Sequence, residues 1–424
     1  MIDQRKTTPL YSWHLSQGAR MSVFGGYDMP LWYRGGMKEE HLSVIQRAGL
    51  FDTSHMSVLS ISGVASFDLL QRCFTKDLAA CIGTNRGPLV PGRCVYGAFL
   101  NEKGHVIDDA IVYDMGGRRY LVVVNAGMGT TICDHLRHHD QTVSCCIDDL
   151  SDRIGKMDLQ GPLAAKILAP LLRDSQSVFE KMPYFSFKGF FDSDESEASA
   201  VLLNDGRPIL LSRTGYTGEF GFEIFVAREA ALDLWKLILT SGETGGLVAC
   251  GLAARDSLRT GAKLPLSHQD IGPWPFIHNP WTFALPFNTE GSGFTKDFIG
   301  AQAIAEDRNA ERTYAFAGYD VRKVSTADPA IVLDRNDRAI GTVLTCATDM
   351  AIDRVENHIA SIASPDRPSD FSPGGLSCGF IKTSAVLRPG NIVKLKDKRR
   401  VLTVEIVDDI RPDRTARRPI IEMA

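Results

Sequence analysis

The 424-residue sequence has no apolar run of the roughly 18 residues that a membrane-spanning helix needs, and no apolar stretch near its N-terminus. The first absence argues against a transmembrane helix, and the second argues against a secretory signal peptide. A surplus of positive charge is also missing, because 47 lysines and arginines stand against 51 aspartates and glutamates. Such a surplus is usual in proteins that bind nucleic acid or membrane surfaces, so we expect neither partner.

Cysteine and histidine patterns typical of metal sites are missing as well. The nine cysteines are an odd number, widely scattered, with no CxxC pair and no zinc spacing. This pattern predicts free thiols and a cytoplasmic protein. His135, His138 and His139 have helical spacing that can chelate a metal, but no carboxylate or thiol is placed to complete the site. A solvated helix end is the better interpretation, and we predict no metal.

What is present is an ordinary globular composition, with 44% hydrophobic and 23% charged residues, in a chain long enough for two or three domains. Helical and strand patterns are mixed up to about residue 310. From Arg312 onward, alternating patterns predict strands almost throughout, which indicates a C-terminal β domain of roughly 110 residues. Gly215, Gly218 and Gly221 fit neither a P-loop nor a dinucleotide-binding motif, and turn glycines explain them.

Two adjacent carboxylates, Asp108 and Asp109, lie inside a segment that otherwise has the pattern of a buried strand. The turn residues 101–104 predict a β-hairpin, and pairing Leu100 with His105 would set Tyr96 directly opposite Asp109. Because strand side chains alternate, only one of the two aspartates can share a face with Tyr96. A tyrosine hydroxyl beside a half-buried carboxylate suits acid–base chemistry. The alternative is that one aspartate caps the hairpin edge and the other is solvated.

Other polar residues lie near the same predicted elements. Asn125 ends the next predicted strand and would lie near Asp109, while Glu223 lies among apolar residues in a second predicted hairpin. Arg255 and Arg259 lie one turn apart on a predicted helix, and paired guanidinium groups indicate an anion or a buried carboxylate partner. His55 is either catalytic or, as is commoner for a lone histidine beside Ser and Thr, a structural hydrogen-bonder.

Together, the motifs resemble those of the aminomethyltransferase (T-protein) family of the glycine cleavage system. The resemblance runs from residue 8 to about residue 345. Its motifs occur in the expected order: TPLY at 8–11, MPLWY at 29–33, GLFDTSHM at 49–56, GHVIDDAIVY at 104–113, LQGP at 159–162, SRTGYTGEFGFEI at 212–224, GLAARDSLR at 251–259 and DFIG at 297–300.

The resemblance implies an α+β fold in which three domains form a cloverleaf around a central folate channel, with an antiparallel, barrel-like β domain at the C-terminus. The first domain would comprise residues 1–56 and 155–257, and would bind folate. The second would comprise 57–154 and 258–310, and would carry the Asp109 hairpin. The third would comprise 311–424.

The implied reaction is attack by N5 of tetrahydrofolate on the aminomethyl carbon carried by the lipoyl arm of an H-protein-like partner, with release of ammonia. Asp109 matches the family's essential catalytic carboxylate, and Glu223 matches an acid that accepts the N–H donors of the pterin ring. The remaining matches to folate-contacting positions are Tyr96, Asn125, Tyr184, Tyr216 and Arg255.

Departures from the family pattern begin after Arg259. Thr260-Gly261 replaces Leu-Glu, and Leu266-Ser267-His268 replaces Leu-Tyr-Gly. Phe283 replaces a tryptophan, and 351–373 resembles an insertion. These departures concern the donor side and leave two alternatives open. One is a folate-dependent demethylase of a small N-, O- or S-methyl compound, and the other is a non-catalytic folate-binding accessory protein.

Overall fold

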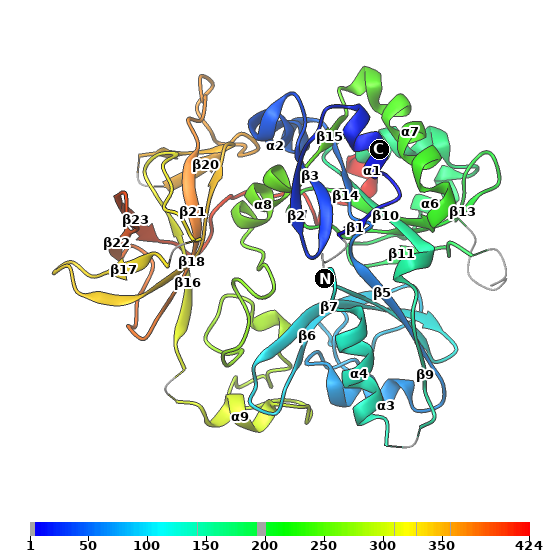
Figure 1. Cartoon of the computed structure of the whole chain (residues 1–424), viewed down its shortest axis with the longest axis horizontal. Helices are drawn as coiled ribbons and strands as arrows, with labels where there is room; N and C mark the ends of the chain where they lie inside the picture. Colours follow the sequence, from blue (N-terminus) through cyan, green and yellow to red (C-terminus); the bar gives the residue numbers. More distant parts are fainter. Residues whose placement is uncertain (1–4, 142, 193–200, 309, 328, 357) are drawn as a thin grey trace.

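The computed structural model describes residues 5–141, 143–192, 201–308, 310–327, 329–356 and 358–424. Three sheet systems account for most of its strands, and Figure 1 shows them as lobes around helix α8 (Leu252–Gly261). None of the helices in these ranges combines the length and apolar character needed to cross a membrane.

The first lobe is built on a seven-stranded sheet in the order β11-β13-β14-β10-β4-β15, with β12 beside β13. Its strands are β4 (Gly49–Asp52), β10 (Ile154–Gln160), β11 (Phe187–Lys188), β12 (Val201–Leu202), β13 (Pro208–Ser212), β14 (Gly221–Ala227) and β15 (Val248–Cys250). Helices α5 (Ala164–Leu168) and α7 (Ala231–Gly242) pack on it, and α7 buries Ala231, Leu234, Trp235 and Ile238. This spacing is that of one apolar helix face.

An N-terminal arm covers part of the first lobe. It contains α1 (Tyr11–Ser16), α2 (Gly36–Gln46) and a small sheet of β1 (Lys6–Thr7), β2 (Arg20–Phe24) and β3 (Tyr27–Trp32). The buried His14 contacts Asp52 at the end of β4, with 2.9 Å between Nε2 and Oδ2. Helix α2 ends at Gln46, and Gly49 pairs with Gln160 as the first residue of β4.

The second lobe is a five-stranded antiparallel sheet in the order β6-β7-β8-β5-β9. Its strands are β5 (Ser57–Ser62), β6 (Cys94–Leu100), β7 (Val106–Gly116), β8 (Arg119–Val124) and β9 (Cys146–Asp149). Helices α3 (Ser66–Cys73) and α4 (Gly129–His139) bury Leu69, Leu70, Ile132 and Leu136 in the core of this lobe.

The third lobe is an antiparallel barrel, in the region where the alternating C-terminal pattern predicts a β domain. It closes in the order β16-β21-β18-β17-β22-β23. These strands are β16 (Arg312–Ala317), β17 (Ile331–Leu333), β18 (Ala339–Asp349), β21 (Leu376–Thr383), β22 (Ile392–Lys396) and β23 (Val401–Ile406). A hairpin of β19 (Ile352–Val355) and β20 (His358–Ser361) lies within the 351–373 segment.

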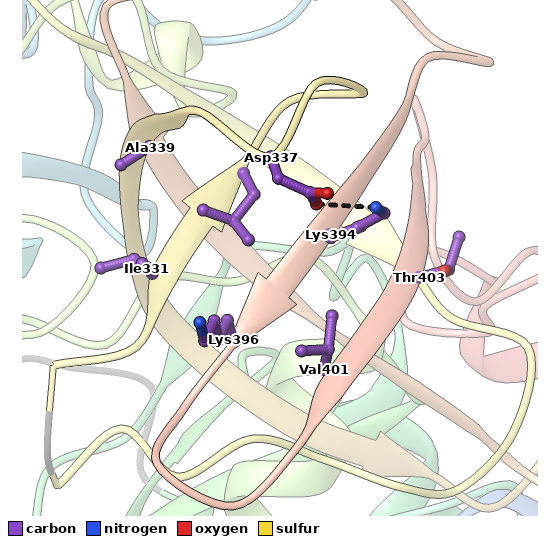
Figure 2. A pocket seen from close by; sticks show the side chains of 8 residues that line it. Ile331, Asp337, Ala339, Lys394, Lys396, Val401 and Thr403 are labelled. Carbon is purple, nitrogen blue, oxygen red and sulfur yellow. Dashed lines mark hydrogen bonds and ion pairs between the residues drawn. The ribbon is translucent and has the colours of Figure 1, made fainter.

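The outer wall of the barrel carries a hollow of about 580 Å³. Figure 2 shows its lining residues, which come from β17, β22, β23, the start of β18 and the turn between β17 and β18. Asp337 of that turn pairs with Lys394 of β22 at 2.7 Å. None of the site residues predicted from the sequence lines it.

We propose the predicted three-domain division with one change. The strands of the first two sheets fall within the predicted ranges, except that β10 begins at Ile154, and the barrel lies within 311–424. The boundary between residues 257 and 258 would cut α8, so we place it after Gly261. A short helix, α9 (Ala301–Glu306), precedes the barrel.

Buried ion pairs join the barrel to the first lobe. Arg411, 1% exposed, donates from Nη1 to Asp349 of β18 and lies 3.2 Å from Glu219 in the loop before β14. Burial opposes the charged form of Arg411, but the two carboxylates outweigh it and raise the pKa of the guanidinium group. Asp349 also contacts His41 of α2, at 3.0 Å.

Removing this guanidinium group is expected to loosen the junction. Arg411→Met leaves Asp349 and Glu219 as buried charges, which should lower the free energy of unfolding by about 3–5 kcal/mol. Urea denaturation followed by circular dichroism measures this. Arg322→Met removes an exposed pair with Asp320 and serves as the matched control, which should leave the midpoint in place. Equal midpoints for the two variants would contradict the assigned role of Arg411.

Candidate active site

The β6–β7 hairpin brings Tyr96 and Asp109 together, but in a different register from the predicted one. Tyr96 pairs with Ile111 and Asp109 with Ala98, two residues from direct opposition. Leu100 pairs with Val106 and not with His105, which accounts for one residue of the shift, and a bulge between Phe99 and Leu100 accounts for the other. The Asn101 side chain accepts from two backbone N–H groups in this turn. A shift of two residues preserves the face. The Tyr96 hydroxyl therefore still donates to Asp109 Oδ2, at 2.8 Å.

Asn125, immediately after β8, connects both aspartates. Its side-chain Nδ2 donates to Asp108 Oδ1 at 2.8 Å and to Asp109 Oδ1 at 2.6 Å. Its backbone N–H donates to Asp108 Oδ2, also at 2.8 Å. Neighbouring residues of β7 do alternate between two hydrophobic cores, as the sequence predicts. Asn125 nevertheless lies beside β7 at a point from which its side-chain amide reaches both carboxylates. Asp108 is thus part of the site that the sequence assigned to Asp109 alone.

The two carboxylates have different surroundings. Asp108 is fully buried and accepts a further hydrogen bond from Ser267 Oγ, at 2.7 Å. Asp109 is only partly buried and receives fewer donors. Burial and the adjacent charge of Asp108 raise the pKa of Asp109 to about 7. Burial, together with the Asp109 charge, raises the pKa of Tyr96 well above its ordinary value, so the tyrosine remains a hydrogen-bond donor.

A second cluster of charges lies on the seven-stranded sheet. Asp158 of β10 pairs in register with Glu223 of β14, and Lys156, two residues earlier on the same strand face, reaches both. Lys156 Nζ lies 2.8 Å from Asp158 Oδ1, and Arg255 Nη1 donates to Asp158 Oδ2 at 2.7 Å. Burial alone would raise the pKa of Asp158, but Lys156 and Arg255 outweigh it and lower the pKa to about 2.

Glu223 is 6% exposed and is held from both sides. One carboxylate oxygen accepts from Lys156, and the other accepts from the Thr214 hydroxyl and, at 3.4 Å, from the Tyr113 hydroxyl. A carboxylate has about four acceptor positions, so the oxygen bonded to Lys156 still has one for an N–H donor of a ligand. Tyr113 lies on β7, four residues after Asp109, so the hairpin also contacts this cluster.

Tyr216 lies between the two clusters. Its ring covers the Arg255 guanidinium group, with 5.0 Å from the ring centroid to Cζ, and its hydroxyl donates to the Pro265 carbonyl. Burial raises the pKa of Tyr216, and the charge of Asp109 adds to that effect. Tyr184 lies at the margin. Its ring contacts Phe185 and faces Arg417 at 5.6 Å, and burial is the main reason that its pKa is raised.

His55 differs from the sequence-based expectation of a structural hydrogen-bonder. His55 is buried at 2% exposure, yet its Nδ1 has no hydrogen-bond partner. Burial lowers the pKa of His55 to about 4. It therefore packs as a neutral ring against Phe24 and Tyr27, and the hydrogen bond that the sequence favoured is missing at Nδ1. Within the described ranges, His135, His138 and His139 form no metal-binding group.

Among the residues that hold the two clusters, sequence reasoning missed Lys156, Asp158, Thr214 and Ser267. For Lys156 and Asp158 a signal existed, because two charged residues at alternate positions in an apolar strand share a face, as they do on β10. For Ser267 there was none, since it approaches Asp108 only through tertiary folding. Conversely, the structure places Tyr96, Asn125, Tyr216, Glu223 and Arg255 around the clusters and Tyr184 beside them.

The fold and the site define an α+β protein that holds two clusters of buried carboxylates, suited to a ligand rich in N–H groups. The chain matches the family model described as the GCVT N-terminal domain over residues 10–276. It is 37% identical over 324 residues to an aminomethyltransferase of Symbiobacterium thermophilum, which covers 76% of this chain and 80% of the relative. An aminomethyltransferase of Bacillus subtilis is 34% identical over 344 residues, which cover 80% of this chain and 86% of that relative.

A solved structure supports the same assignment. The glycine cleavage system aminomethyltransferase T from Bartonella henselae superposes with a TM-score of 0.74 at 26% identity, covering 98% of this chain and 99% of that one. The chain belongs to the aminomethyltransferase family of the glycine cleavage system. The predicted family and the predicted fold class are both confirmed.

The raised pKa of Asp109 predicts a pH-dependent stability difference. The carboxyl binds its proton more tightly in the folded chain, so its contribution is fully present below the ordinary pKa of 3.8 and is lost as the pH rises through about 7. Asp109→Asn should therefore gain stability relative to the unsubstituted chain by up to about 1.4 kcal/mol per pH unit between pH 5 and 7. Urea denaturation across pH 5–9 measures this, and a pH-independent difference would contradict it.

Proposed function

We propose that this chain transfers a one-carbon unit from an aminomethylated carrier to tetrahydrofolate, with release of ammonia, as an aminomethyltransferase of the glycine cleavage type. The observation that carries the proposal is the Asp108–Asp109 pair, joined by Asn125 and contacted by Tyr96, in a chain of this family. Nothing in the site or in the comparisons favours the demethylase or the non-catalytic binder.

The donor set fits a reduced folate. A pterin ring presents adjacent N–H donors, and Glu223 is a buried acceptor whose position is fixed by Lys156 and Thr214. Tyr216 and Tyr184 supply aromatic faces. Arg255 donates to Asp158 and neutralises its negative charge. We assign Tyr96, Asn125, Tyr184, Tyr216, Glu223 and Arg255 to folate binding. Tetrahydrofolate, when bound, supplies the amine that accepts the one-carbon unit.

Asp109 is the residue that we assign to catalysis. Its pKa of about 7 makes it a carboxylate in half or more of the molecules at neutral and higher pH, so it can orient an amine and stabilise positive charge that develops there. Tyr96 and Asn125 fix its two oxygens separately. A carboxylate held in this way needs little reorganisation during the reaction.

We infer that the donor side of the site is open. Phe283 is 52% exposed, and its ring lies 5.7 Å from that of Tyr96, which supports an opening on this side of Asp109. A small free donor would need a closed pocket, whereas a carrier arm needs an open mouth. We therefore propose a lipoylated H-protein-like carrier as the partner.

The nine free cysteines suit a reducing cytoplasm, which is the compartment that we propose.

The test of this function supplies tetrahydrofolate together with aminomethylated H-protein, and identifies the folate product. We expect 5,10-methylenetetrahydrofolate and ammonia in equal amounts. In parallel reactions, methylated amines, sulfonium compounds and methoxyaromatics replace the carrier. Formation of 5-methyltetrahydrofolate from one of these, with no product from the carrier, would reject the proposal.

Within that assay, Asp109→Asn should lower turnover at least about a hundredfold, because the amide cannot stabilise developing positive charge. Folate affinity should change little. Asp114→Asn is the matched control, since Asp114 lies on the same strand and accepts from the Gly116 backbone, away from Asn125. If both variants lose turnover alike, Asp109 does not have the assigned role.

Glu223→Ala should weaken tetrahydrofolate binding by about 1–3 kcal/mol, because ligand N–H donors lose their buried acceptor. Glu223→Gln keeps the shape of the side chain and removes only its charge, so it should lose part of the affinity. Comparing the two variants separates the loss of charge from misfolding. Isothermal titration calorimetry measures both. Glu229→Ala, at an exposed position just after β14, is the control and should bind as the unsubstituted chain does. Unchanged affinity in both Glu223 variants would remove Glu223 from the folate site.

A further inference from the structure

His268 lies between solvent and the buried Asp108. Its Nε2 is 3.5 Å from Asp108 Oδ1, and its side chain is 48% exposed, whereas that of Asp108 is 0% exposed. The preceding residue, Ser267, donates to the same Asp108 oxygen at 2.7 Å. Two consecutive residues of the loop after α8 therefore contact the carboxylate that adjoins Asp109.

The backbone fixes the imidazole in this position. His268 has φ of +64°, in the left-handed region that favours glycine. The turn is held because the Asp270 carboxylate accepts from the Leu266 N–H at 2.9 Å and also pairs with the buried Arg259. Side chains with positive φ persist when their surroundings determine the conformation, often at functional sites.

The electrostatic consequence concerns Asp109. Asp108 accepts from Asn125 twice and from Ser267, which is an arrangement for an anion. Its negative charge is one reason that the pKa of Asp109 is raised. A cation against Asp108 offsets that charge. The contact with Asp108 in turn raises the pKa of His268, so the imidazole carries its proton further into the neutral range.

We propose that His268 is a positioning residue that acts through Asp108: its imidazolium compensates the Asp108 carboxylate and so sets the pH range in which Asp109 is ionised. This role rests on the function proposed above, in which Asp109 is the catalytic carboxylate.

Other charged and titratable groups around the pair do not change charge near neutral pH. Tyr96 faces Asp109 from β6, and Tyr216 faces it from the loop before β14, and both have pKa values well above neutrality. Behind Tyr216, Arg259 pairs with Asp270 and Arg255 pairs with Asp158, so these charges are held in ion pairs. His268 and Asp109 are therefore the groups whose protonation is expected to shape the pH profile.

The test compares pH profiles of kcat with aminomethylated carrier from pH 5.5 to 9. His268→Gly suits the positive φ, and asparagine in His268→Asn also tolerates it. Loss of the cation should shift the acidic limb, which reports ionisation of Asp109, upward by about half a pH unit to one unit. Activity at pH 9 should recover to within about threefold, because the imidazole is neutral there in the unsubstituted chain.

The matched control is His278→Asn. His278 is a histidine of the same loop with φ of +56°, but it faces Arg312 and Asp307 and not the carboxylate pair. The acidic limb of the kcat profile of His278→Asn should therefore coincide with that of the unsubstituted chain. An unshifted limb in both His268 variants overturns the proposal, and so does a loss of kcat that is equal at every pH, because that result indicates a structural role.

A second measurement does not depend on activity. The stability difference that Asp109→Asn produces is followed against pH by urea denaturation, once in the unsubstituted chain and once in a chain that already carries His268→Asn. The pH above which that difference becomes constant reports the ionisation of folded Asp109, and it should move upward by the same half unit to one unit when His268 is replaced. If the chain transfers no one-carbon unit in any assay but this upper limit moves, the proposed function fails and the electrostatic role of His268 stands. An unmoved upper limit overturns that role.

Discussion

The structure depends on hydrogen-bond donors and cations that neutralise the carboxylates buried between its sheets. A buried charge without a partner costs several kcal/mol, so each acid must receive donors, and most of these come from other segments. Asp108 receives them from Asn125 and Ser267, Asp158 from Lys156 and Arg255, and Asp349 from His41 and Arg411. The groups that join the lobes are therefore also the groups that fix the geometry of the site.

Helix α8 has a central part in this arrangement. Arg255, Ser257 and Arg259 all lie on this one helix, yet they reach three different surroundings. Arg255 contacts Asp158 of the first sheet, Ser257 contacts His41 and the barrel, and Arg259 contacts Asp270 in the loop that follows. That loop carries the Ser267 and His268 side chains to Asp108. A helix that sets three networks at once cannot shift without disturbing the site.

Two adjacent acids on one strand differ because their surroundings differ. Asp108 is fully buried and surrounded by donors, while Asp109 is partly exposed beside a negative charge. Environment thereby gives chemically identical side chains different proton affinities, which is the usual way that enzymes separate roles between paired carboxylates. The loop that follows α8 contacts this pair through Ser267 and His268, which both reach Asp108.

The sequence by itself determined the family, the fold class, the β6–β7 hairpin and the shared face of Tyr96 and Asp109. These follow from local alternation, turn residues and ordered motifs, and survive a register shift of two residues. Only the tertiary structure decided that Asn125 joins both aspartates, that Lys156 and Arg255 hold Asp158, and that His268 reaches Asp108. These contacts join residues from different strands and loops, so their distances depend on how the sheets pack, and that packing has no local pattern in the sequence.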